Sequence, residues 1–174
     1  MAYPDDLLEL ARNLLESVAT DVGPSLNQAG LRRGVSTAYY AIFHLLIDEA
    51  TVNWGREELR PELGRLFDHG RMRAASTELQ AEIVRSLPKG TKGSTDKQLN
   101  ANVRMNENLR IVASTFLGAQ QARNQADYNT AKIWTRDDAL WEVERVVEAF
   151  EAWLAVRMEP RAQAYLLSLL GKRG

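Results

Sequence analysis

The sequence predicts an all-α protein, an up-and-down helical bundle of about four to five core helices followed by a short C-terminal helix. The stretch Ala38–Ile47 is apolar or amphipathic at every position, which is typical of a helix covered on most sides. Several other segments repeat apolar residues every three or four positions, the period of an amphipathic helix. No stretch alternates apolar and polar residues between turn signals, as a half-buried strand does. A chain of 174 residues is long enough to bury the core of such a bundle.

The first two helices occupy the N-terminal third of the chain. The first begins at Pro4 and the two acids that follow it, a favourable helix start, and is predicted to end near Val22. Its apolar residues recur at helical spacing: Leu7, Leu8, Ala11, Leu14, Leu15 and Val18. The central helix opens at Ser25 or Asn27 and extends to about Ala50. It carries small residues that allow another helix to approach closely, at Gly34, Ala38 and Ala41.

The middle of the chain returns to a helical pattern between Arg56 and Leu87. Pro61 is expected to begin a fresh helix at its first turn, and Asp68–Arg71 marks a break in the pattern. The stretch Leu87–Lys97 holds two glycines, one proline and three lysines with almost no apolar content. We therefore predict a long flexible loop there.

The last third of the chain contains two longer helices and a short one. A long helix is predicted to start between Ser94 and Asp96 and to run to Tyr128. Thr135 and Asp138 then fit a capping box at the start of the next helix, which ends before Pro160. The final apolar helix either seals the bundle or supplies an oligomer contact, and we favour sealing. We accordingly divide the chain into the bundle, residues 1–157, and an accessory C-terminal helix with its tail, residues 158–174.

The composition excludes several classes of protein. The formal net charge of −1 gives no global basic field, so any nucleic-acid contact must come from a local patch. The absence of cysteine excludes disulfides, thiol nucleophiles and cysteine-based metal sites. The N-terminus lacks the basic and apolar regions of a secretory signal, and the buried helix is too short to span a bilayer. We therefore expect a cytoplasmic protein without a membrane partner.

The two histidines do not predict a metal or catalytic site. His44 and Asp48 lie four residues apart on the central helix and would supply only two metal ligands, while His69 beside Asp68 is no stronger a candidate. Two histidines also give too little for a Ser-His-acid arrangement. The run 89–95 lacks the spacing of a P-loop and precedes no strand. We predict no metal and no cofactor.

A crowd of polar residues at the end of the long helix is the first candidate site. Arg123 and Asp127 lie four residues apart, so they share a helix face and can pair. In one interpretation the pair only stabilises a solvated helix end. In the other, Asp127 holds Arg123 so that its planar guanidinium contacts a phosphate.

Basic residues elsewhere are more typical of solvated faces. The exceptions are Arg32 and Arg33, which begin the buried part of the central helix and can reach a neighbouring acid or an anion. The other basic clusters are Arg65, Arg71 and Arg73, followed by Lys89, Lys92 and Lys97.

Two separated segments, taken together, resemble a known family. The first, Arg32–His44, reads Arg-Arg-Gly-Val-Ser-Thr-Ala-Tyr-Tyr-Ala-Ile-Phe-His, and the second, Arg123–Asn129, reads Arg-Asn-Gln-Ala-Asp-Tyr-Asn. Both are similar to segments of the small prokaryotic branch of the HEPN family (higher eukaryotes and prokaryotes nucleotide-binding domain). The second corresponds to the segment before the last core helix of that branch. Order and separation fit, and the resemblance covers roughly residues 5–157 as a helix pattern.

The resemblance implies a helical bundle that forms homodimers, with polar motifs of both protomers meeting in one cleft. It also implies a prokaryotic toxin–antitoxin or defence system, often with a nucleotidyltransferase or antitoxin as partner. Many members are metal-independent ribonucleases, whose signature is an arginine, a small polar residue and, about a turn later, a histidine. Arg123 and Asn124 match the start of this signature, and Tyr128 stands where the histidine is expected.

The substitution at Tyr128 leaves three functions open. A phenol with a pKa of about 10 is mostly neutral near pH 7 and serves poorly as a base. The first hypothesis is therefore an RNA- or nucleotide-binding protein with weak or no nuclease activity. Its expected contacts are Arg123, Asn124, Arg32 and Arg33.

The second hypothesis is an active, metal-independent endoribonuclease toxin. Arg123 would stabilise the charge on the phosphorane, while Asp127 and Tyr128 would take the place of histidine, with His44 as a further candidate base. The third hypothesis is a structural helical module that binds a protein partner.

Overall fold

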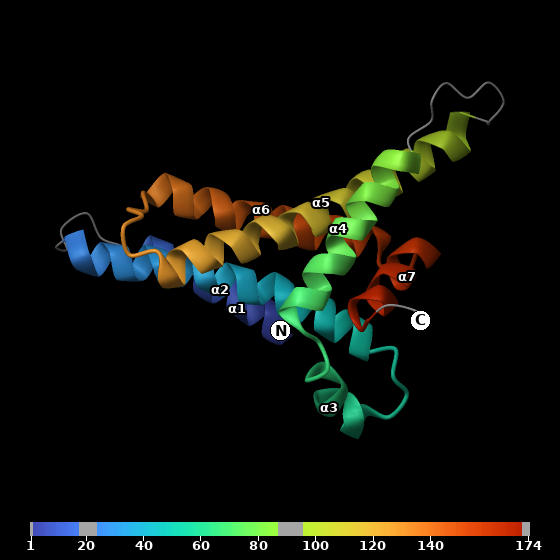
Figure 1. Cartoon of the computed structure of the whole chain (residues 1–174), viewed down its shortest axis with the longest axis horizontal. Helices are drawn as coiled ribbons and strands as arrows, with labels where there is room; N and C mark the ends of the chain where they lie inside the picture. The colour runs from blue at the N-terminus through green and yellow to red at the C-terminus, as the bar shows by residue number, and fades with distance from the viewer. Residues whose placement is uncertain (1, 18–23, 87–95, 172–174) are drawn as a thin grey trace. The chain divides into compact units, whose positions relative to one another are not determined.

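The computed structural model describes residues 2–17, 24–86 and 96–171. Figure 1 shows α-helices throughout, and no strand occurs among the described residues. The helices are α1 (Tyr3–Glu16), α2 (Pro24–Thr51), α3 (Arg60–Gly64), α4 (His69–Ser86), α5 (Asp96–Tyr128), α6 (Arg136–Val156) and α7 (Pro160–Leu169), and a 3-10 turn, η1, spans Glu57–Leu59. The predicted all-α helical bundle is confirmed. Among the described helices, none combines the length and apolar character that crossing a bilayer requires.

The described part of the chain forms two compact units. The first combines residues 1–46 with residues 115–150, and the second combines residues 47–114 with residues 151–174. The boundary predicted between residues 157 and 158 stays a prediction. The predicted end of the first helix, near Val22, lies outside the described residues, as do Lys89 and Lys92 of the predicted loop.

In the first unit, α1 packs closely against α2 because Gly34 has no side chain (Figure 1). A Cβ atom at Gly34 would lie 2.6 Å from Cδ2 of Leu15, which is fully buried. The predicted close approach at this residue is confirmed. The second half of α5 packs on α2 through Tyr39 and Phe116, whose ring centroids are 5.9 Å apart.

The connection from α5 to α6 is fixed by α2 and by its own cap. The side-chain amide of Gln28 donates to the carbonyl of Trp134 at 2.7 Å and accepts from its N–H at 2.9 Å. Oγ1 of Thr135 accepts from the N–H of Asp138 at 3.0 Å, and the carboxylate of Asp138 accepts from the N–H of Thr135 at 3.3 Å. The predicted capping box is therefore confirmed.

In the second unit, the segment after α2 contains two helices, α3 and α4, as the predicted break implies. Pro61 lies in the first turn of α3, as expected, but α3 ends at Gly64. The next helix begins at His69, where Oδ1 of Asp68 accepts from the N–H groups of Gly70 and Arg71, both at 3.0 Å. The break therefore exists but lies at residues 65–68, so its predicted position over Asp68–Arg71 is wrong for residues 69–71, which belong to α4.

The C-terminal helix α7 packs against α4 in this unit. Its buried residues are Ala162, Tyr165, Leu166 and Leu169. The hydroxyls of Ser76 and Tyr165 lie 2.8 Å apart and are buried. Since Oγ of Ser76 also donates to the carbonyl of Met72, the Tyr165 hydroxyl is the donor to Ser76. The packing on α4 does not test whether α7 seals the bundle or supplies an oligomer contact, and sealing stays a prediction.

Candidate functional site

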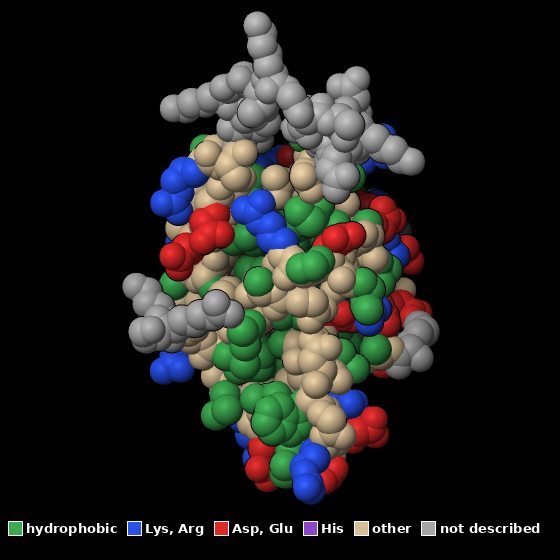
Figure 2. Space-filling view, turned by 90° about the vertical axis from the view of Figure 1, so that its right-hand side faces the viewer, with side chains coloured by type: hydrophobic (Ala, Val, Ile, Leu, Met, Phe, Trp, Pro, Cys, Tyr) green, Lys and Arg blue, Asp and Glu red, His purple; other side chains and the backbone are tan. Residues whose placement is uncertain are grey.

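Charges are mixed over much of the described surface. On the face drawn in Figure 2, basic and acidic side chains are interspersed among hydrophobic ones, so its described residues form no continuous basic area. This agrees with the net charge of −1 and directs the search to local clusters. The strongest cluster lies in the first unit, where the C-terminal end of α5 faces α2.

Arg123 and Asp127 form the ion pair that their spacing predicts. Nε of Arg123 lies 2.8 Å from Oδ2 of Asp127, and the two side chains are 22% and 21% exposed. The Nε–H group is buried and not aligned for a hydrogen bond, so the attraction is mainly that of the two charges. Oγ of Ser36, on α2, donates to the same carboxylate oxygen at 3.3 Å.

The terminal nitrogens of Arg123 are held by two further residues. Nη2 donates to the hydroxyl of Tyr40 on α2 at 2.9 Å, and Nη1 donates to Oδ1 of Asn124 at 3.2 Å. Because a guanidinium carries two N–H groups on each terminal nitrogen, one on each remains without a partner among the described residues. Desolvation acts to lower the pKa of Arg123, but the oxygens of Tyr40 and Asp127 outweigh it and raise the pKa, so the group stays charged.

Two tyrosine rings lie within cation–π distance of the Arg123 guanidinium. Its Cζ atom is 5.6 Å from the ring centroid of Tyr40 and 5.3 Å from that of Tyr128. Tyr128 is 71% exposed, so most of its ring is open to solvent. We call Arg123, Asn124, Asp127, Tyr128 and Tyr40 the Arg123 cluster.

His44 extends the cluster along α2. Ser36, Tyr40 and His44 follow one another at intervals of four residues and therefore share one helix face. The rings of Tyr40 and His44 are 6.5 Å apart between centroids, and Tyr3 packs edge-on against His44 at 4.9 Å. Among the described residues, no three His, Asp or Glu side chains are placed to hold a metal ion.

Arg32 has a structural role at the end of α5. Its Nη1 donates to the carbonyls of Ala126 at 2.7 Å and Asn129 at 3.1 Å. Its Nη2 donates to those of Thr130 at 3.4 Å and Lys132 at 2.5 Å. A phosphate would have to displace these carbonyls, so this geometry gives the predicted RNA contact by Arg32 no support.

The neighbouring Arg33 is arranged differently. It is exposed and has no partner among the described residues. Arg33 precedes Ser36 by three residues and Tyr40 by seven, so helical spacing places it on the face of α2 that carries the cluster.

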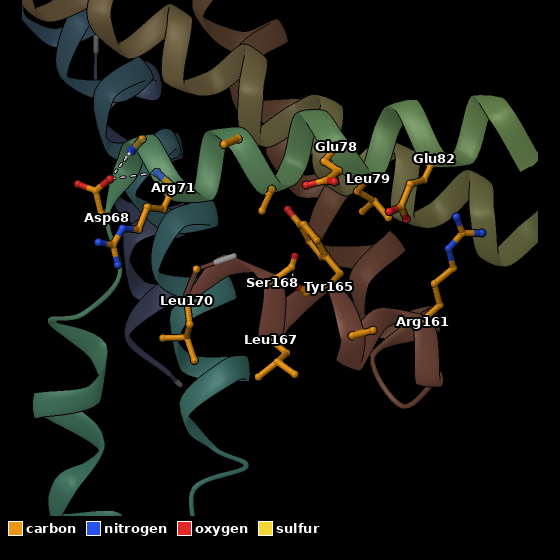
Figure 3. Close-up of a pocket in the computed structure, with 15 residues that line it drawn as sticks. Asp68, Arg71, Glu78, Leu79, Glu82, Arg161, Tyr165, Leu167, Ser168 and Leu170 are labelled. Carbon is orange, nitrogen blue, oxygen red and sulfur yellow. Dashed lines mark hydrogen bonds between the residues drawn. The ribbon is translucent and has the colours of Figure 1, made fainter. Parts of the chain in front are cut away.

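The second unit contains an open groove. It has a volume of about 1350 Å³ and lies between α4 and α7 (Figure 3). Glu78 and Glu82 line it together with aliphatic side chains such as Leu79 and Leu167. Tyr165 contributes to its floor, but its hydroxyl is already bonded to Ser76. Asp68, Glu78 and Glu82 line the groove together with Arg71 and Arg161, so its charge is mixed and it offers no basic surface to nucleic acid.

Sequence reasoning missed the roles of Tyr40 and Ser36. Both lie in or beside the run that we interpreted as covered on most sides, and that interpretation hid the polar face within it. The available signal was the four-residue spacing of Ser36, Tyr40 and His44.

Comparisons of the chain with models of protein families, with curated proteins and with solved structures give no match.

Proposed function

We propose that this chain is a HEPN-like RNA- or nucleotide-binding protein and that the Arg123 cluster contacts the phosphate and base. The observation that carries the proposal is the state of the Arg123 side chain. It is oriented by Asp127 and Tyr40, keeps one N–H on each terminal nitrogen without a described partner, and lies against the exposed ring of Tyr128.

This arrangement suits the two chemical features of a nucleotide. A planar guanidinium with two available N–H groups gives bidentate contacts to a phosphate. An exposed aromatic ring offers a stacking surface for any base, and such stacking is common in single-stranded RNA recognition. Asn124 adds an amide that can bond a base edge, and Arg33 adds a positive charge on the adjacent helix face.

Negative charge at the C-terminal end of α5 repels a phosphate unless a positive group compensates for it. The C-terminal end of α5 carries a partial negative charge from its last carbonyl groups, and Asp127 adds a full negative charge. Arg32 places its guanidinium on those carbonyls and reduces this repulsion. Arg32 therefore supports the site without touching the ligand.

The residues favour binding over cleavage. Asp127 is engaged by Arg123 and Ser36, and a phenol is a weaker general base than the imidazole of the family signature. One observation favours a second candidate, a metal-independent endoribonuclease. His44 neighbours Tyr40, which itself bonds Arg123, so an imidazole lies in the same row of residues as the guanidinium.

The wider setting belongs to the proposal and rests on the family resemblance. We propose a cytoplasmic homodimer in a prokaryotic toxin–antitoxin or defence system, with a nucleotidyltransferase or antitoxin as partner. Light scattering of the purified chain tests the homodimer, and a monomer at all accessible concentrations would contradict it.

Fluorescence anisotropy with labelled single-stranded RNA in the presence of a chelator tests binding. Arg123→Ala should weaken binding by at least about tenfold, because hydrogen bonds to a charged group are lost. Arg110→Ala is a matched control, since Arg110 lies on the same helix and is paired with Glu107 three residues away. Equal affinity of both folded variants would contradict the assigned site, and absence of wild-type binding would favour the structural module.

The same samples, analysed by gel electrophoresis, separate binding from cleavage. Intact RNA with Arg123-dependent binding is the expected result. Cleavage that survives the chelator and disappears in His44→Gln but persists in Tyr128→Phe would instead identify a nuclease that uses the imidazole. The reverse pattern would assign the base to Tyr128.

A further inference from the structure

A second pair of an exposed aromatic ring and an arginine lies on α6 in the first unit. Trp141 is 59% exposed, and Cζ of Arg145 lies 4.5 Å from its ring centroid, one helical turn further along. The Arg145 side chain is only 25% exposed. The pair thus repeats the combination found at Tyr128 and Arg123, an open ring against a partly buried guanidinium.

The position of Arg145 depends on a glycine in α5. A Cβ atom at Gly118 would lie 2.9 Å from both terminal nitrogens of Arg145, so only glycine leaves this space free without moving the guanidinium. Oε2 of Glu142 lies 3.6 Å from Nη1 of Arg145, an ion pair without a hydrogen bond. The guanidinium therefore rests on the backbone of α5 next to a buried carboxylate.

Arg145 keeps its donors available. It makes no hydrogen bond to any described residue, and its guanidinium lies beside Gly118, Trp141 and Glu142. Unsatisfied donors in a partly desolvated position are costly unless water or a ligand bonds them. Carbonyl groups of bases and phosphate oxygens are acceptors of the right kind.

An exposed polar strip of α5 separates the two aromatic–arginine pairs. Gln121, Asn124 and Tyr128 are exposed at intervals of three and four residues, so they form one face of the helix. Arg123 reaches α2 on one side of α5, whereas Gly118 meets Arg145 of α6 on the other. The ten-residue interval from Gly118 to Tyr128 corresponds to about 15 Å along α5, so the guanidinium of Arg145 and the ring of Tyr128 lie beside different turns of this helix.

We propose that Trp141 and Arg145 form a second base-stacking subsite, so that single-stranded RNA lies along the exposed strip of α5 between Tyr128 and Trp141. This inference rests on the proposed function and specifies its ligand as an oligonucleotide. Trp141 stacks one base, Tyr128 stacks another, and the amides of Gln121 and Asn124 face the chain between them. Stacking platforms that alternate with cationic groups are the usual means of holding a single strand.

Two probes, a nucleoside monophosphate and a single-stranded RNA oligonucleotide, test the subsite by isothermal titration. Trp141→Ala should weaken oligonucleotide binding by about tenfold and leave mononucleotide binding at the Arg123 cluster unchanged. Trp54→Ala is the control, because Trp54 is 49% exposed but has no arginine against its ring among the described residues. Arg145→Gln should also weaken oligonucleotide binding while the exposed Trp141 ring is retained.

Intrinsic fluorescence gives an independent readout. Trp134 and Trp153 are buried, so quenching by RNA reports on the exposed tryptophans, and it should disappear in Trp141→Phe but persist in Trp54→Phe. Wild-type oligonucleotide affinity in Trp141→Ala, combined with loss in Arg123→Ala, would overturn the second subsite and leave the proposed function intact. If no variant lost RNA binding, or if the wild type did not bind RNA, both the second subsite and the proposed function would be overturned.

Discussion

Nη2 of Arg123 donates a hydrogen bond of 2.9 Å to the hydroxyl of Tyr40 and so joins the polar end of α5 to α2. Next to this bond the same two helices meet through apolar rings, with Tyr39 packed on Phe116. The pKa of Tyr39 is raised, mainly because burial disfavours the charged phenolate, so this side chain stays neutral within the core. The orientation of the guanidinium is therefore set by a residue on a different helix as well as by Asp127.

Removal of the Tyr40 hydroxyl should loosen Arg123 while the ring beneath it remains. We expect Tyr40→Phe to lower the free energy of unfolding by about 1 kcal/mol. RNA affinity should fall by a few fold, roughly up to tenfold, because Nη2 loses its fixed direction. Denaturant titration and anisotropy measure the two effects. Tyr3→Phe is the control, since Tyr3 contacts His44 through its ring. A loss of stability with unchanged affinity would limit the Tyr40 hydroxyl to a structural role.

The contact between α1 and α2 at Gly34 should not tolerate a methyl group. Alanine favours the helix by about 1 kcal/mol over glycine, but the new Cβ would overlap with Leu15, which is fully buried and has little room to move. We expect the steric overlap with Leu15 to outweigh the gain in helix propensity, so Gly34→Ala should lower the free energy of unfolding by about 1–2 kcal/mol. In Gly55→Ala the added Cβ meets no atom within 4 Å, and stability should change little. Equal unfolding midpoints for both variants would contradict the close approach.

The parts of the fold that local chemistry controls could be predicted from the sequence. The capping box of Thr135 and Asp138 and the helix start at Pro61 depend only on neighbouring residues, and the structure confirms both. The break between α3 and α4 could be predicted, but its position could not, because Asp68 caps α4 and brings residues 69–71 into the helix. Which helices lie side by side depends on contacts between distant residues, such as Gln28 with Trp134, that no local pattern specifies.

The same distinction between local spacing and contacts of distant residues applies to the candidate site. The pair of Arg123 and Asp127 could be predicted because a spacing of four residues fixes it within one helix. The contribution of Tyr40 could not, since it requires knowledge that α2 faces α5. Arg32 shows the limit most clearly. Its position at the start of the buried helix suggested contact with a neighbouring acid or an anion. In the structure its guanidinium instead donates to backbone carbonyls nearly 100 residues later in the chain, such as that of Asn129.

Two adjacent arginines should differ sharply when replaced by alanine. Arg32→Ala removes bonds from the carbonyls of Ala126 and Lys132 and should lower the free energy of unfolding by at least about 2 kcal/mol. Arg33→Ala removes an exposed side chain and should change stability by no more than about 0.5 kcal/mol. RNA affinity should fall in the folded Arg33 variant if Arg33 belongs to the binding face. Thermal unfolding and anisotropy separate the two roles, and similar melting temperatures for both variants would contradict the capping role of Arg32.

Glu142 should give stability a dependence on pH that runs opposite to that of a paired carboxylate. Burial raises its pKa, while Arg145 and Lys132 act to lower it and Asp138 to raise it further. A raised pKa means that the folded state binds more protons than the unfolded state between the two pKa values. Stability from this group is therefore present at lower pH and is lost as the pH rises through the folded pKa. Glu142→Gln removes the titration, so the stability of this variant relative to wild type should increase with pH across that window.

Denaturant titrations over a pH series measure this difference. Glu144→Gln is the control for removing one negative charge, because Glu144 is exposed on the same helix. A difference between Glu142→Gln and wild type that falls with rising pH would mean that attraction to Arg145 outweighs burial. We expect the difference to increase with pH, because the ion pair is too loose to offset the desolvation of Glu142. Its Oε2 lies 3.6 Å from Nη1 of Arg145 and accepts no hydrogen bond from a described residue.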